Sequence, residues 1–141
     1  MRAGSAARVR WRRRVAEAGL GDRIHFLGFY SDVRRLLWAA DALASPTRYE
    51  AYGLAVQEAV CCGLPVLVSE AAGVAERIGG EARRLLIADP DDAEGVAARL
   101  RAWRAGLEGH RSAALALSAQ MRQWTWDDMA RSIAERVEAA R

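Results

Sequence analysis

Short apolar runs alternate along this chain with longer stretches in which apolar residues recur every three or four positions. The longer stretches predict amphipathic helices, and the short runs bounded by turn residues predict buried strands. The expected helices are 5–18, 32–40, 52–62 and 73–78, followed by three that carry 96–107, 114–124 and 126–137. The expected strands are 24–27, 42–44, 66–68 and 85–87. This alternation predicts an α/β fold, a Rossmann-like parallel sheet with flanking helices.

The tryptophans follow the apolar positions of the predicted helices, and we expect them to pack in the core rather than to stack on a sugar. They are Trp11, Trp38, Trp103, Trp124 and Trp126.

The length of 141 residues is that of one domain, and no internal repeat or linker divides it. We therefore treat residues 1–141 as a single domain. The first helix is unusual, because in a doubly wound sheet each helix follows a strand and no strand precedes residues 5–18. The chain is therefore expected to begin one strand late, as a fragment of a larger fold would.

Composition bears on the location of the protein. No apolar run approaches the roughly 20 residues that span a bilayer, and the basic N-terminus lacks the apolar segment of a signal peptide. Cys61 and Cys62 are neighbours on a predicted helix, where their side chains point apart, so we expect no disulfide between them. These features favour a cytoplasmic location.

The net charge of +3 says little about partners, because all 21 basic residues are arginine, which indicates a compositional bias of the genome. Five of these arginines lie within residues 8–14. A solvated helix face is the favoured interpretation of this run. Association with a membrane surface is an alternative. We expect no nucleic-acid partner, and a basic-helix nucleic-acid binder is a third hypothesis that rests on this run alone.

The candidate chemistry lies between Ser45 and Ser69, in a run that predicts a strand, a polar loop, a buried helix and a second strand. Glu50 stands in the loop, and Glu58 lies about two turns into the helix. Between them, the backbone N–H groups around Gly53 come to a helix N-terminus. Hydroxyl acceptors beside an anion-binding backbone suit a ligand with both hydroxyls and phosphate, such as a nucleotide-sugar.

Several motifs in order add a family resemblance. They are F-L-G at 26–28, A-A-D and A-S-P-T within 39–47, E-x7-E at 50–58, A-V-C-C-G-L-P-V at 59–66, A-G-V-A-E at 72–76 and a late tryptophan at 126. Together they resemble the C-terminal, donor-binding domain of GT-B glycosyltransferases, and more narrowly the retaining enzymes of family 4 (group 1). The E-x7-E spacing alone is a weak signal, and the C-G-x-P-V block directly behind it makes the match specific.

The resemblance implies a role for each residue of the candidate site. Glu50 is expected to contact hydroxyls of the donor sugar, as the catalytic residue. The amides of Tyr52, Gly53 and Leu54 are expected to hold the distal phosphate. Glu58 is expected to accept hydrogen bonds from the ribose hydroxyls of the nucleotide.

Three further residues complete the expected donor site. The resemblance places Gly28 and Phe29 near the base, and Arg48, two residues before Glu50, is a candidate contact for a phosphate. Enzymes of this kind transfer the sugar with retention and need no bound metal. We therefore expect no metal and no cofactor, with the nucleotide-diphosphate sugar as co-substrate. The sequence does not indicate the acceptor.

Parts of the family pattern are absent from this sequence. The family's domain opens with a strand and a Gly-rich turn, preceded by an arginine and a lysine that neutralise the diphosphate, whereas this chain contains no lysine. The acceptor-binding N-terminal domain is also missing and would be a partner. We therefore expect a fragment that is inactive alone. The alternative is a non-catalytic interaction module or a degenerate relic of a glycosyltransferase.

Overall fold

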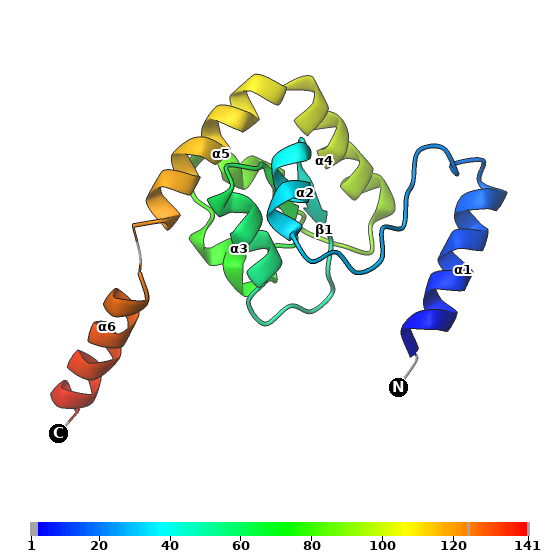
Figure 1. Ribbon diagram of the computed structural model, residues 1–141. Helices are drawn as coiled ribbons and strands as arrows, with labels where there is room; N and C mark the ends of the chain where they lie inside the picture. The colour runs from blue at the N-terminus through cyan, green and yellow to red at the C-terminus, as the bar shows by residue number, and fades with distance from the viewer. Residues whose placement is uncertain (1–2, 124, 141) are drawn as a thin grey trace. The chain divides into compact units, whose positions relative to one another are not determined.

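The computed structural model describes residues 3–123 and 125–140. Contacts between residues divide the chain into two compact parts, which we call unit 1 (residues 1–32) and unit 2 (residues 33–141). Unit 1 is blue in Figure 1, and unit 2 runs from cyan to red. A single domain over residues 1–141 stays a prediction.

Unit 1 consists of helix α1 (Ala3–Glu17) followed by an irregular segment. The guanidinium of Arg12 lies 5.7 Å from the centre of the Phe26 ring, so the segment returns beside the helix. The strand predicted over residues 24–27 does not form, and this prediction is wrong. A strand needs a neighbour to bind its backbone N–H and C=O groups, and no strand lies beside these residues within the described part of unit 1.

Unit 2 alternates strands with helices, as the sequence pattern predicts. Its elements are α2 (Val33–Ala39), β1 (Leu43–Ser45), α3 (Leu54–Cys61), β2 (Val66–Val68), the 3-10 helices η1 (Gly73–Arg77) and η2 (Gly80–Leu85), α4 (Ala93–Ala105), α5 (Leu107–Met121) and α6 (Trp126–Ala139). Within the described residues, no helix combines the length and the apolar character needed to cross a bilayer.

The sheet is small and parallel. β1 pairs with β2, and Leu43 lies opposite Val66 while Ser45 lies opposite Val68. α3 forms the crossover between the two strands. The fourth strand predicted over residues 85–87 is reduced to a single parallel bridge between Ser69 and Ile87, so this prediction is wrong in extent.

The core of unit 2 forms around β2, which is buried along its whole length. Burial on both faces explains why this strand reads as an unbroken apolar run. α3 packs against β2 and against α5, which are contacts within the same core, and it contributes its apolar face to that core; α3 and α5 are labelled in Figure 1. The apolar side chains that these helices bury are Val56, Ala59 and Val60 from α3 and Ala114, Leu117 and Met121 from α5.

The C-terminal end of α3 is tied to α5 by hydrogen bonds. The Ser118 hydroxyl donates to the Cys61 carbonyl at 2.9 Å, and Nε of Arg122 donates to the same oxygen at 2.7 Å. These bonds satisfy a carbonyl that has no partner inside a helix end. Cys61 and Cys62 are free thiols, as expected. The anchoring at this end helps to fix the direction in which α3 presents its N-terminus.

Most of the tryptophans do not pack in the core, so that prediction is wrong for them. Trp11, Trp38 and Trp126 are 46%, 67% and 81% exposed. Trp103 is partly buried against a small cluster of Leu67, Leu85 and Ile87. Trp124 lies outside the described residues. An apolar stripe predicts which face of a helix would be buried. Burial also requires another surface of the protein to cover that face.

Candidate functional site

Three loops of unit 2 follow the carboxyl ends of parallel strands. Residues 46–53 follow β1, residues 69–72 follow β2, and residues 88–92 follow the bridge residue Ile87. In open α/β sheets, ligands bind in the crevice outside the carboxyl ends of the strands. The loop after β1 contains Glu50, so the structure places the sequence-predicted site where this fold class binds ligands.

Backbone hydrogen bonds hold the first loop against the start of η1. The N–H of Gly73 donates to the Glu50 carbonyl at 3.3 Å, and the N–H of Val74 donates to the Tyr52 carbonyl at 2.7 Å. A Cβ atom added to Gly73 would overlap the carbonyl oxygen of Ala51. The two segments therefore touch backbone to backbone, and only glycine permits this approach.

Gly53 opens α3 in a conformation that favours glycine. It is buried, with φ +103°, and a Cβ added to it would lie 3.0 Å from Cγ1 of Val74. Its carbonyl accepts hydrogen bonds from the N–H groups of Val56 and Gln57, both at 3.0 Å. The first N–H groups of a helix have no partner inside it, and no side chain caps α3 in the described structure. The N-terminus of α3, starting at Leu54, is therefore open to an anion.

The two acidic residues lie on either side of this helix start. Glu50 is partly buried, and its Oε1 accepts a hydrogen bond of 3.3 Å from the N–H of Tyr52. Glu58 is exposed and lies about one turn after Leu54, so Leu54 and Glu58 share a face of α3. Four predicted residues, Glu50, Tyr52, Gly53 and Leu54, thus lie at one helix N-terminus, where the Tyr52 amide is already bound to Glu50, and Glu58 lies one turn further along α3.

Arg48 has a partner that sequence reasoning missed. Its Nε donates to both carboxylate oxygens of Asp91, at 2.7 and 3.0 Å, and its Nη2 lies 2.7 Å from Oδ1. Hydrogen bonding to Arg48 lowers the pKa of Asp91, and the same bond raises the pKa of Arg48. The sequence shows Asp91 only as part of a helix start, because nothing local indicates a partner 43 residues away.

Gly28 and Phe29 belong to unit 1. Gly28 has φ +76°, and a Cβ added to it would lie 3.7 Å from Nη1 of Arg8. The Phe29 ring is 96% exposed. The structure describes the surroundings of these two residues within unit 1. Their place beside a base stays a prediction.

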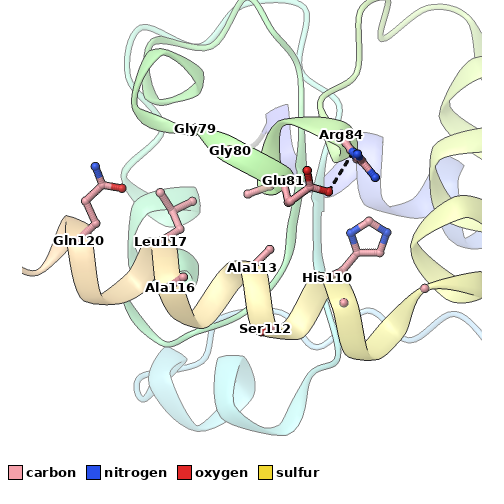
Figure 2. A pocket seen from close by; sticks show the side chains of 13 residues that line it. Gly79, Gly80, Glu81, Arg84, His110, Ser112, Ala113, Ala116, Leu117 and Gln120 are labelled. Atoms are coloured by element: carbon pink, nitrogen blue, oxygen red, sulfur yellow. Dashed lines mark ion pairs between the residues drawn. The ribbon is translucent and has the colours of Figure 1, made fainter.

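A hollow of about 760 Å³ lies elsewhere in unit 2, between η2 and α5. Figure 2 shows its borders, which include His110, Gln120 and the ion pair between Glu81 and Arg84, 3.0 Å apart. No predicted site residue lines it. Across the described residues, no three His, Cys, Asp or Glu side chains gather as ligands for a metal ion.

Sequence comparison decides the family. The profile of the family described as glycosyl transferases group 1 matches residues 3–111. The chain belongs to this family. This group 1 chain is similar to the lipopolysaccharide core biosynthesis mannosyltransferase LpsB of Rhizobium meliloti, to which it is 38% identical over 80 residues. That match covers 55% of this chain and 23% of the relative, so the chain spans about a quarter of the length of the curated protein.

Two solved structures resemble the group 1 chain closely in fold. HepE from Anabaena, solved in complex with UDP, superposes with a TM-score of 0.82 at 23% identity, over 97% of this chain and 38% of HepE. Sucrose-phosphate synthase from Thermosynechococcus elongatus gives a TM-score of 0.82 at 27% identity, over 99% of this chain and 36% of the synthase. Both have the GT-B fold, and the α/β fold predicted from the sequence as part of a GT-B protein is confirmed.

Proposed function

We propose that this chain is the donor-binding domain of a glycosyltransferase and binds a nucleotide-diphosphate sugar for retaining transfer to an acceptor. The observation that carries the proposal is the N-terminus of α3, which has no side-chain cap and is flanked by Glu50 and Glu58. Membership of the group 1 family and the UDP bound to the structural neighbour HepE support a nucleotide ligand.

The helix start of α3 supplies the phosphate contacts in this proposal. The amides of Gly53 and Leu54 hold the distal phosphate, aided by the positive end of the helix dipole. The Tyr52 amide joins them once it exchanges its bond to the Glu50 carboxylate for one to the phosphate. This exchange also frees Glu50 to accept hydrogen bonds from the hydroxyls of the donor sugar.

Glu58 supplies the contacts to the nucleoside. Its exposed carboxylate on α3 accepts hydrogen bonds from both ribose hydroxyls.

Transfer by this proposal needs no metal or cofactor. As the sugar leaves, the helix dipole and basic side chains stabilise the charge that develops on the diphosphate. An acceptor bound by a separate domain completes the reaction, and the chain by itself binds the donor without transferring the sugar.

Calorimetric titration with UDP, GDP and ADP tests the proposal, with wild type compared with Glu58→Ala. We expect saturable binding of at least one of the three, weakened roughly tenfold or more in the variant because the ribose hydroxyls lose a charged partner. Glu108→Ala, an exposed glutamate on α5 and outside the site, is the matched control and should bind as wild type does. A folded chain that binds none of the three would contradict the proposal.

The same titration separates the alternative, a non-catalytic interaction module. The sheet favours it in one respect, because β1 pairs with β2 alone and no other described strand pairs with its second edge. Such an edge pairs readily with a strand of another chain. A folded chain without nucleotide binding would favour this alternative.

A further inference from the structure

We propose that the ion pair between Arg48 and Asp91 positions Glu50, and that Arg48 is a positioning residue rather than a phosphate contact. This inference rests on the proposed function, because the role of Glu50 toward the donor sugar is part of that proposal. It concerns a pair that joins the loop after β1 to the loop before α4.

The geometry of the pair is that of a strong planar contact. Nε and Nη2 of Arg48 meet the Asp91 carboxylate at 2.7 to 3.0 Å, an arrangement that fixes both the distance and the plane of the two groups. The backbone at Asp91 is itself held, since its N–H donates to Oδ1 of Asp89 at 2.8 Å. Arg48 therefore binds a residue that lies in a hydrogen-bonded turn.

The pair completes a set of bonds around the segment that carries Glu50. On one side, the carbonyls of Glu50 and Tyr52 accept from the N–H groups of Gly73 and Val74. On the other, Arg48 ties the same loop to Asp91. Glu50 thus stands between two attachments, and losing either gives its backbone more freedom.

A phosphate role for Arg48 is less favoured by these contacts. A phosphate would have to displace a carboxylate that already takes two nitrogens of the guanidinium. Both side chains are largely exposed, 80% for Arg48 and 57% for Asp91, so the pair adds little to global stability. Its effect is expected in the local geometry of the loop, where a binding measurement detects it.

The test compares Arg48→Gln, Asp91→Asn, the double variant and the reversed pair Arg48→Asp with Asp91→Arg. Each is titrated with UDP and UDP-glucose, and with GDP and GDP-mannose. The gain in affinity from nucleoside diphosphate to sugar conjugate reports on Glu50. We expect either single change to reduce this gain by roughly three- to tenfold, with binding of the diphosphate unchanged. The gain in affinity should be no smaller in the double variant than in either single variant. The reversed pair should recover part of the gain that the single variants lose.

A second measurement tests the pair without any ligand. The Tyr52 N–H donates to the Glu50 carboxylate, so its hydrogen exchange reports on the pose of Glu50. We expect faster exchange at Tyr52 in both single variants and slower exchange again in the reversed pair. Arg101→Gln, which breaks the exposed ion pair with Glu94 on α4, is the matched control and should leave this amide as in wild type.

The outcomes separate the hypotheses. Weaker diphosphate binding in Arg48→Gln but not in Asp91→Asn would make Arg48 a phosphate contact and overturn the inference. Unchanged sugar gain and unchanged Tyr52 exchange in both single variants would overturn it as well. If wild type binds no nucleotide, the proposed function fails, and Tyr52 exchange alone then decides whether the pair positions Glu50.

Discussion

At the scale of single residues, the backbone of two glycines sets the geometry of the candidate site. Gly53 adopts φ +103° at the start of α3, and Gly73 lies in backbone contact with Ala51. Exchange of the Glu50 side chain removes its carboxylate and the bond to the Tyr52 amide, and it is expected to leave the contact between Gly73 and Ala51. A change at either glycine instead moves the chain that carries Glu50 and the helix amides.

Gly53→Ala is expected to lower the free energy of unfolding by about 1–2 kcal/mol, because a residue with a Cβ pays this to adopt the left-handed region. The added methyl group would also lie 3.0 Å from Cγ1 of Val74, so the buried contact must shift. Urea denaturation measures the effect. Gly79→Ala is the control, since Gly79 has φ −110° and no atom within 4 Å of an added Cβ. Equal stability of the two variants would contradict the prediction.

How much of the site the sequence predicts depends on the separation of its residues. Glu50, Gly53 and Glu58 lie within one short segment, so local spacing alone was enough to predict that they surround a helix start. Asp91 could not be predicted in this way, because its bond to Arg48 joins two loops that only the folded sheet brings together. The approach of Gly73 to the same segment depends on the sheet in the same manner.

At the scale of elements, α6 shows how a helix start is defined by a few local bonds. The Thr125 hydroxyl accepts from the Asp128 N–H at 3.2 Å, and the Asp128 carboxylate accepts from the Thr125 N–H at 2.9 Å. This reciprocal capping box satisfies donors that the helix leaves free. The bonds from the Thr125 hydroxyl and then from its N–H lower the pKa of Asp128 below its ordinary value of 3.8.

The capping box makes the start of α6 sensitive to acid. Because the folded-state pKa is lowered, the stabilisation is present above 3.8 and is lost as the pH falls through the folded-state value. Thr125→Ala is expected to raise the pKa of Asp128 toward 3.8 and to lower the helical content of α6. An NMR titration of the Asp128 carboxyl carbon measures this. Thr125→Ser keeps the hydroxyl and should keep the low pKa, and an unchanged pKa in Thr125→Ala would contradict the prediction.

The elements also show where periodicity stops being informative. β2 was predicted with the observed bounds, because a strand buried on both faces gives an apolar run in any context. The run at 24–27 is apolar except for His25, yet it forms no strand in unit 1. Strand formation depends on a partner supplied from elsewhere in space, and such a partner leaves no mark in the local sequence.

At the scale of the whole molecule, the charges of the chain are unevenly divided. Residues 1–32 contain seven arginines and three acidic residues, a net charge of +4, whereas the whole chain has only +3. Unit 2, which carries the α3 site, is therefore slightly negative. The site binds an anion in our proposal through backbone amides and a helix dipole rather than through surplus positive side chains. Binding of the donor and transfer of its sugar therefore make different demands on the charges of the chain.

Binding without transfer is accordingly the expected behaviour of the chain alone. In the proposed function, recognition of the donor depends on the start of α3 and on Glu58, which is exposed on that helix. Transfer also needs an acceptor held beside the anomeric carbon of the sugar and positive charge on the leaving diphosphate. The sequence contains no lysine, and Arg48, the arginine nearest Glu50 in sequence, is engaged by Asp91.

The measurement is NMR of UDP-glucose and GDP-mannose incubated with the chain at concentrations that saturate it. We expect the sugar conjugate to be hydrolysed no faster than in a buffer blank. Line broadening of the nucleotide signals reports binding. Glu58→Ala, which should reduce the broadening and leave the conjugate equally intact, controls for non-specific contact. Release of UDP or GDP above the blank by wild type, abolished by Glu50→Gln, would contradict the prediction. It would mean that α3 and Glu50 alone supply enough stabilisation of the leaving group for chemistry.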